Sequence, residues 1–167
     1  MRRLATMDDC TDLAALHVLG WQQAYKGLLP EELLNELDTN ERRKMWEQTL
    51  KNKEMPVFVD FDGGALIGFA ACGVCNDIDA KPEWGELGAL YYLQTYWGTG
   101  RAAILYHHVI DHLRAIGSST ATLWVLDGNA RAIAFYRKLG FRFDGQEKSQ
   151  RVSGFTMREL RMTLRLT

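Results

Sequence analysis

The chain has 167 residues, of which 47% are hydrophobic and 25% charged, and its formal net charge is −1. This length suits one domain with a full core, and these proportions are ordinary for soluble globular proteins. A nearly neutral chain has no electrostatic field that would attract nucleic acid or an anionic membrane surface. It also lacks a run of about 18 apolar residues, the length that spans a bilayer. We therefore expect one domain over residues 1–167, with neither nucleic acid nor a membrane as partner.

The N-terminus and the cysteines predict the compartment. The first residues, MRRLATMDDC, lack the apolar stretch of a signal peptide. Three cysteines in a chain of this length fit a reducing environment better than a disulfide framework. We expect a cytoplasmic protein.

The N-terminal part predicts a short strand at residues 2–5 and a helix over residues 9–25. That helix has two apolar stripes, and a helix that is apolar on two sides must be covered twice. One stripe is expected to face the sheet, and the other a neighbouring helix or a ligand cleft. The second stripe contains Trp21 and Tyr25, for which structural packing is an alternative explanation.

Proline, glycine and polar residues divide the next segments. Pro30 suits a first helical position, and the Asp62-Gly63-Gly64 run suits a hairpin turn. The expected elements are helices over residues 31–37 and 41–50, strands over residues 56–61 and 65–74, and a polar loop over residues 76–84.

The most informative stretch runs from Gly85 to Phe141. An apolar strand is expected over residues 87–93, a polar turn over residues 94–97, and a helix over residues 102–116. Gly98 and Gly100 lie between the turn and the helix. The unpaired N–H groups and the dipole at a helix N-terminus attract anions, and glycines allow the backbone to approach a phosphate closely. This order of elements therefore suits a phosphate site, although such glycines can also serve the turn alone.

Two familiar phosphate motifs do not fit this stretch. A Walker loop needs Gly-Lys-Ser/Thr, where this chain has Gly100-Arg101-Ala102. A dinucleotide fingerprint needs an acidic residue about 20 positions further on, at the end of a second strand. Here that position falls at the end of the helix, near Gly117.

The sequence WGTGRA at residues 97–102 lies about thirty residues before NARAIAFYRKLGF at residues 129–141. This pair resembles the acetyl-CoA-binding core of the GNAT N-acetyltransferase superfamily. That core has Gln/Arg-x-x-Gly-x-Gly/Ala, a helix, a strand and a closing Asn-x-x-Ala-x-x-Phe/Leu-Tyr-x-Lys-x-Gly-Phe. Trp97, Arg101 and Ala103 depart from the usual residues, but the apolar spacing of Leu105, Val109, Leu113 and Ile116 keeps the register without a gap.

The resemblance implies a binding site for acetyl-CoA in a wedge between two strands. Backbone groups at the end of the first of these strands would lie along the pantetheine: Leu90, Tyr91, Tyr92 and Leu93. Amide groups of the turn and the helix start would hold the pyrophosphate: Gly98, Thr99, Gly100, Arg101, Ala102 and Ala103. The Arg101 side chain would contact a phosphate or point to solvent. Asn129 would contact the cofactor in addition to acting as a helix N-cap.

The resemblance also implies catalytic roles. Tyr136 would protonate the leaving thiolate, whereas without the resemblance it is a tyrosine at the edge of the core. Glu86 is the candidate base for the acceptor amine and a candidate acceptor-binding residue, with a solvated carboxylate as the alternative. Trp21 and Tyr25 would line the acceptor site. Asp77, Asp79, Glu83 and Glu86 could attract a cationic acceptor or form a solvated loop.

No metal is expected. Cys72 and Cys75 form a C-x-x-C in a strand pattern, where their side chains point to opposite faces, so they are interpreted as structural. His107, His108 and His112 lack the glutamate of an H-E-x-x-H pattern or a third nearby ligand and are interpreted as a surface cluster.

The C-terminal part predicts a strand over residues 141–146, a connection over residues 147–154 and a strand over residues 155–166. The expected fold is mixed α/β: a twisted, mostly antiparallel sheet of about seven strands, with helices on both faces and one central parallel βαβ unit. The resemblance implies an acetyl-CoA-dependent N-acetyltransferase, in which a primary amine of a small molecule or peptide attacks acetyl-CoA directly in a ternary complex. A silent acyl-CoA-binding or sensory module of the same fold is the alternative. Homodimers are frequent in the resembled family.

Overall fold

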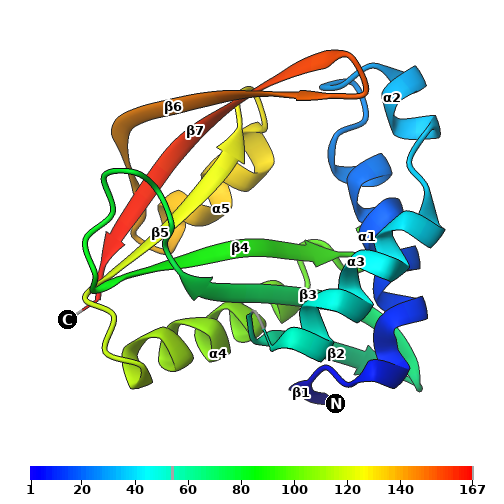
Figure 1. Ribbon diagram of the computed structural model, residues 1–167, viewed down its shortest axis with the longest axis horizontal. Coiled ribbons are helices and arrows are strands. Elements are labelled where there is room, and N and C mark those ends of the chain that lie inside the picture. Colours follow the sequence, from blue (N-terminus) through cyan, green and yellow to red (C-terminus); the bar gives the residue numbers. More distant parts are fainter. Residues whose placement is uncertain (54, 167) are drawn as a thin grey trace.

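The computed structural model describes residues 1–53 and 55–166. Its centre is a seven-stranded sheet in the order β1-β2-β3-β4-β5-β7-β6, shown in Figure 1. Every neighbouring pair is antiparallel except β4 and β5, which are parallel. The strands are β1 (Arg2–Leu4), β2 (Val57–Asp62), β3 (Ala65–Val74), β4 (Trp84–Tyr92), β5 (Thr120–Leu126), β6 (Arg142–Val152) and β7 (Phe155–Arg165).

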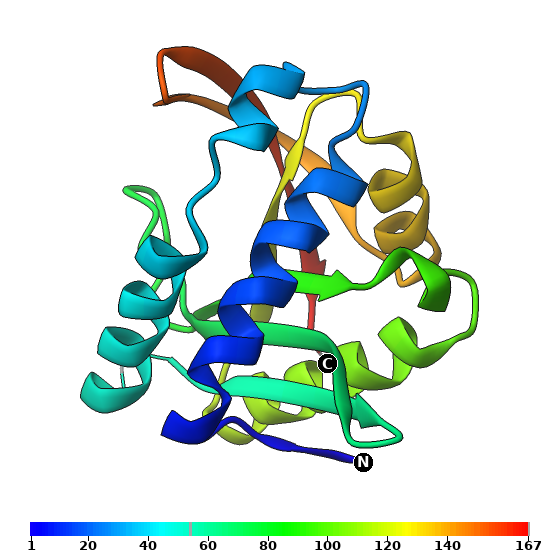
Figure 2. The ribbon, with the colours of Figure 1, turned by 90° about the vertical axis from the view of Figure 1, so that its right-hand side faces the viewer.

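Helices cover both faces of the sheet (Figure 2). The first face carries α1, α2 and α3, and the opposite face carries α4 and α5. The helices are α1 (Cys10–Ala24), α2 (Glu31–Asn35), α3 (Thr39–Asn52), α4 (Arg101–Ala115) and α5 (Ala130–Lys138), with short 3-10 turns at η1 (Met7–Asp9) and η2 (Gln94–Tyr96). The expected mixed α/β fold, with its central parallel βαβ unit, is confirmed.

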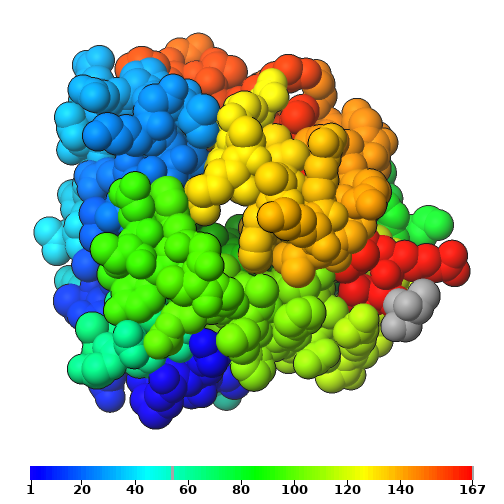
Figure 3. Space-filling view, turned by 180° about the vertical axis from the view of Figure 1, so that it is seen from behind, coloured from blue at the N-terminus to red at the C-terminus, as the bar shows by residue number. Residues whose placement is uncertain are grey.

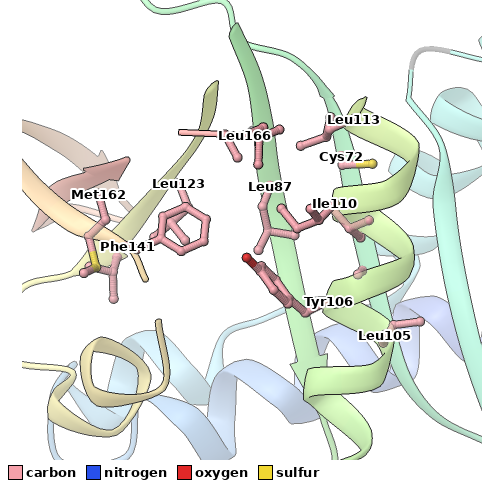
Figure 4. Close-up of a cluster of buried hydrophobic side chains, with 14 of the residues drawn as sticks. Cys72, Leu87, Leu105, Tyr106, Ile110, Leu113, Leu123, Phe141, Met162 and Leu166 are labelled. Carbon is pink, nitrogen blue, oxygen red and sulfur yellow. The ribbon is translucent and has the colours of Figure 1, made fainter. Parts of the chain in front are cut away.

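The core beneath α4 follows the predicted helical spacing. Leu105, Val109 and Leu113 are fully buried, and Figure 4 shows the α4 side chains against Leu87 of β4. Ile116 was expected on the same apolar face, but half of it is exposed. The reason is that α4 ends at Ala115, and Gly117, with a φ of +87°, turns the chain away.

Both apolar stripes of α1 are covered, as expected. One stripe lies on β4 so closely that a Cβ at Gly20 would come 3.2 Å from the ring of Tyr91. Leu13 and Ala14, from the two stripes, are both fully buried. The close contact between Gly20 and Tyr91 fixes the C-terminal end of α1 next to the end of β4.

The predicted end of β6 is wrong. The strand continues to Val152 instead of ending at residue 146, and a tight turn at Ser153 and Gly154 joins it to β7. Residues 142–151 are exposed, because β6 is an edge strand of the sheet. An edge strand with polar residues on both faces shows no alternating apolar signal, so its pairing with β7 could not be read from its own pattern.

The parallel strands β4 and β5 separate along their length. In the described part of the chain they pair only through Trp84, Gly85 and Glu86 of β4. Further on, the register of β4 with β3 shifts by one residue at Gly88. Such a bulge bends a strand and increases its twist. The last residues of β4 and β5 therefore lie apart, and a cleft opens between them.

In the part of the chain that the structure describes, no helix is both long and apolar enough to cross a membrane.

Candidate active site

A cleft of about 510 Å³ lies where β4 and β5 separate. We call it the β4–β5 cleft. Its walls come from residues 87–92 of β4, the turn and helix start at residues 96–98, 100, 102 and 103, residues 124–126 of β5, Asn129 and one side of α5 as far as Lys138. Figure 3 shows this side of the molecule hollowed between the green residues around the turn and the yellow residues around α5. Ala24 and Tyr25 at the end of α1 close its far side.

The N-terminus of α4 faces this cleft. Gly98 and Gly100 adopt positive φ angles of 76° and 83°, and a Cβ at either glycine would meet no atom within 4 Å. The first hydrogen bond of the helix runs from Ile104 N–H to Gly100 C=O at 3.3 Å. The N–H groups of the three preceding residues, 101–103, have no carbonyl of the same helix to which they could donate. They leave a set of backbone donors at the positive end of the helix dipole.

Thr99 differs from its neighbours in the turn. Its N–H and its hydroxyl both donate to the carbonyl of Tyr96, at 3.4 and 2.7 Å. The residue does not belong to the cleft wall. Thr99 thus closes the turn internally, and the free donors are those on either side of it.

The Arg101 guanidinium follows neither of the two expected directions. It lies 3.3 Å from Asp60 Oδ2 and 2.9 Å from Asp62 Oδ1, on β2 and away from the cleft. Tyr92 also donates to Asp60 Oδ2, at 3.0 Å. Because Asp60 is fully buried, its carboxylate needs these donors. The side chain of Arg101 therefore fastens the start of α4 to β2, and only its backbone N–H remains for an anion.

Substituting leucine for Arg101 is expected to lower the unfolding temperature by several degrees, because Asp60 loses a charged donor. Affinity for acetyl-CoA, measured by calorimetry, should stay within about threefold, because the guanidinium does not line the cleft. Arg114→Leu is the matched control on the same helix, since Arg114 forms only an exposed pair with Asp111. A large loss of affinity with no loss of stability in Arg101→Leu would contradict this assignment.

A different guanidinium belongs to the cleft wall. Arg131, in the first turn of α5, lies 3.7 Å from the ring centroid of Trp97, and both residues line the cleft. The indole N–H of Trp97 donates to the carbonyl of Tyr92 at 2.9 Å, which holds the ring in place. Sequence reasoning missed this cation–π contact, because residues 97 and 131 are far apart in the chain. The local sequence around one of them carries no information about the other.

Asn129 and Tyr136 lie on the α5 side of the cleft. Asn129 Oδ1 accepts the N–H of Ala132 at 3.2 Å, so the expected N-cap is present. The Tyr136 ring packs against Phe135 and Phe141, with centroids 5.3 and 5.8 Å away. No group in residues 1–53 or 55–166 hydrogen-bonds to its hydroxyl. Burial raises the pKa of Tyr136 well above its ordinary value, so the phenol keeps its proton.

Tyr25 and Trp21 were both expected to line the acceptor site, and the structure places them in different surroundings. Tyr25 lines the cleft, and its hydroxyl lies 2.8 Å from that of Tyr91. Trp21 is not part of the cleft wall; it packs among the leucines of α2 and under the guanidinium of Arg42. Trp21 therefore lies in a packed cluster, although its buried indole N–H has no hydrogen-bond partner within the described residues. Tyr25 connects the end of α1 to the cleft.

Glu86 lies at the closed end of the cleft, on the face of the sheet that carries α1, and is not part of the cleft wall. Its side chain is half-buried. Burial, followed by the nearby carboxylate of Asp77, raises the pKa of Glu86 above its usual range, and Lys148 partly offsets this. Such a carboxyl accepts protons more readily than an exposed one.

Two of the four acidic residues of the predicted cluster form ion pairs within the protein. Asp77 and Asp79 bind the buried Arg161 of β7, at 2.9 and 2.6 Å. Asp144 completes this set of ion pairs at 2.7 Å. These contacts fasten the loop before β4 to β7. Because one guanidinium faces three carboxylates, the set keeps a net negative charge. An arginine among the apolar residues of a strand was the signal that could have predicted them.

Cys72 and Cys75 are both buried, whereas His107 and His108 are exposed and His112 is half-buried with its ring 5.8 Å from that of Phe58. Cys72 is buried, and burial raises the pKa of its thiol to about 12, which leaves it unreactive. Within the described residues, no group of three or more potential metal ligands comes together.

Comparison with known proteins identifies this combination of fold and cleft. The sequence matches the acetyltransferase (GNAT) family over residues 20–141, so the chain belongs to this family of N-acetyltransferases. It is 31% identical to the N-acetyltransferase YuaI of Bacillus subtilis, over 81% of this chain and 76% of that protein.

Two solved structures share the fold. The PaiA N-acetyltransferase of Thermoplasma acidophilum, in complex with coenzyme A, superposes with a TM-score of 0.80 at 18% identity, covering 99% of this chain and 98% of that one. The acetyltransferase YncA of Salmonella typhimurium, with acetyl-CoA, gives a TM-score of 0.74 at 21% identity, covering 100% and 94%.

Proposed function

We propose that this protein transfers an acetyl group from acetyl-CoA to a primary amine of a small molecule or peptide by direct attack in a ternary complex. One observation carries the proposal. The residues whose N–H groups start α4 and Tyr136, whose hydroxyl has no partner within the described residues, line one cleft between separated strands. Phosphate groups suit the donors, and a leaving group that needs a proton suits the hydroxyl.

Backbone groups would do most of the cofactor binding. The N–H groups of Gly98, Gly100, Arg101, Ala102 and Ala103 would hold the pyrophosphate without adding a titrating group. Arg131, which lies over Trp97 at the cleft wall, would add positive charge from the opposite side.

The exposed edge of β4 would bind the pantetheine arm. Beyond Glu86 this edge is not paired with β5, so every second residue presents free N–H and C=O groups to the cleft. Leu90, Tyr91, Tyr92 and Leu93 were expected along the pantetheine. Leu93 is bonded internally, because its N–H donates to the Ile67 carbonyl at 3.0 Å and its carbonyl accepts the Tyr96 N–H at 2.9 Å. By alternation Tyr91 also faces β3, so the backbone groups of Leu90 and the N–H of Tyr92 would remain for the pantetheine, since the Tyr92 carbonyl accepts the indole N–H of Trp97. Amide groups of a pantetheine could pair there as an additional strand would.

Tyr136 would act as the acid. Acetyl-CoA supplies the acyl group as a thioester, whose sulfur leaves as a thiolate that must be protonated. Burial raises the pKa of Tyr136, so the phenol keeps its proton until the reaction needs it. As the bond between the acyl carbon and the sulfur breaks, the phenol would donate that proton to the thiolate that forms.

Glu86 would accept the proton that the acceptor amine loses, directly or through water. Its position at the point where β4 and β5 separate, on the α1 face, puts the base on the opposite side of the sheet from α4. This arrangement would separate the carboxylate that accepts the proton from the anionic cofactor. It would also place the acceptor amine and the cofactor on different faces of the sheet at one opening.

Glu86 is expected to give an acidic limb in the pH profile of kcat. Since burial raises its pKa, the active carboxylate is lost as the pH falls through a value above the ordinary 4.5 of glutamate. Glu86→Gln should lower kcat by about 100-fold and abolish this limb. Glu83→Gln, an exposed residue three positions earlier, is the control and should leave the profile unchanged. An identical acidic limb in Glu86→Gln would exclude the base role.

The alternative is a silent acyl-CoA-binding module. The unpartnered hydroxyl of Tyr136 in the cleft favours the enzyme, because binding alone does not need an acid. Calorimetric titration with acetyl-CoA, combined with a thiol-release assay on a panel of primary amines, separates the two. Binding together with turnover supports the transferase, and binding without turnover on any amine supports the module.

A further inference from the structure

A lysine of the chain lies over an aromatic wall of the cleft. Lys148 Nζ lies 4.3 Å from the ring centroid of Trp124 and 3.8 Å from Oε2 of Glu159. The amide of Gln150 also donates to this oxygen, at 3.0 Å. An indole face and a carboxylate together form a good site for a primary ammonium group. Here the chain's own ammonium group fills it.

Trp124 is a fixed part of the cleft wall. Its indole N–H donates to Asp77 Oδ1 at 3.2 Å, and Asp77 in turn binds the buried Arg161. The ring therefore keeps its orientation whether or not Lys148 is in place. Since Trp124 lines the β4–β5 cleft, a molecule in the cleft can reach the same ring.

Two carboxylates lie on either side of this ring. On β5, Thr122, Trp124 and Leu126 point to one face of the sheet, because side chains alternate along a strand. Glu86 lies opposite Thr122, and Glu159 lies opposite Leu126. The four steps from residue 122 to residue 126 span about 13 Å of strand. Glu86 and Glu159 therefore face the Trp124 ring from its two ends, and only Glu86 has the role of base in the proposed reaction.

Lys148 can leave this position at little cost. It comes from the exposed edge strand β6, and its side chain is 43% exposed, against 15% for Glu159. A flexible lysine of this kind gains rotamer freedom when it is released. Burial raises the pKa of Glu159 while Lys148 lowers it, as expected for a carboxylate that favours a cation beside it. When Lys148 leaves, Glu159 becomes available to pair with an incoming cation, whereas Asp77 stays paired with Arg161.

We propose, building on the acetyltransferase function above, that the acceptor is an amine with a second cationic group. This group binds on Trp124 next to Glu159, in the position that Lys148 occupies, while the reacting amine lies toward Glu86.

The test compares three acceptors of equal chain length: cadaverine, pentylamine and δ-aminovalerate, whose far ends are cationic, apolar and anionic. We expect kcat/KM for cadaverine to exceed that for pentylamine by about tenfold or more, and δ-aminovalerate to be the poorest. Glu159→Gln should remove most of the preference for cadaverine, and Lys148→Met should lower the KM for cadaverine. Glu147→Gln, on the same hairpin but paired with Arg158, is the matched control and should change neither.

Two measurements separate this inference from the proposed function. Turnover that shows no preference for cadaverine, or a preference that persists in Glu159→Gln, overturns the second-cation site and leaves the transferase intact. Absence of turnover on all amines counts against the transferase. In that case calorimetric binding of cadaverine alone decides the site: tighter binding to wild type than to Glu159→Gln supports it, and equal or no binding overturns it.

Discussion

Substituting glutamate for Gly100 is expected to weaken acetyl-CoA binding by about 100-fold or more, measured by isothermal titration calorimetry. Gly100 is the N-cap of α4, and a Cβ there would meet no atom within 4 Å. Because Gly100 also lines the cleft, the new side chain would have open space next to the free N–H groups. Its carboxylate would occupy the positive end of the helix and repel the phosphates of the cofactor.

The substitution should leave the protein folded. A side chain at a φ of +83° costs about 1–2 kcal/mol, but a carboxylate at a helix N-terminus is favourable and offsets part of that cost. Gly64→Glu is the matched control, because Gly64 has a φ of +88° and similar open space but lies in the β2–β3 turn, outside the cleft. It should show the same backbone strain and unchanged affinity. Wild-type affinity in Gly100→Glu would rule out phosphate binding by this turn.

Local signals in the sequence predicted the elements that depend on neighbouring residues. The apolar spacing of Leu105, Val109 and Leu113 predicted α4, and the glycine turn after Asp62 predicted the β2–β3 hairpin. The side chain of Asn129 predicted the N-cap of α5. In each case the physical cause lies within one or two turns of chain, so a single sequence contains it.

Contacts between distant residues could not be predicted in the same way. Strict alternation from Leu87 would place residues 89 and 91 on the α4 face of the sheet. The bulge at Gly88 instead directs Tyr91 to the α1 face, toward Tyr25, and Tyr92 to the α4 face. The direction of Arg101 depends likewise on Asp60, about forty positions earlier. Secondary-structure propensities and the period of the apolar residues carry no information about such distant partners.

Replacing Tyr136 with phenylalanine is expected to lower kcat by about 1,000-fold, while the dissociation constant of acetyl-CoA stays within about twofold. Phenylalanine keeps the ring that packs against Phe135 and Phe141 and removes only the hydroxyl, which has no hydrogen-bond partner among the described residues. The cleft should keep its shape and lose its proton donor. A thiol-release assay at saturating amine measures kcat, and calorimetry measures binding.

Tyr106→Phe is the control for this substitution. Tyr106 is buried, and its ring lies 6.1 Å from that of Phe141, but it does not line the cleft. It should leave kcat unchanged, which separates loss of a proton donor from loss of a phenol in the core. An acyl donor whose thiol has a lower pKa needs less protonation, so Tyr136→Phe should impair it less than acetyl-CoA. Equal impairment with both donors would contradict the acid role, because a mere packing defect would not distinguish between leaving groups.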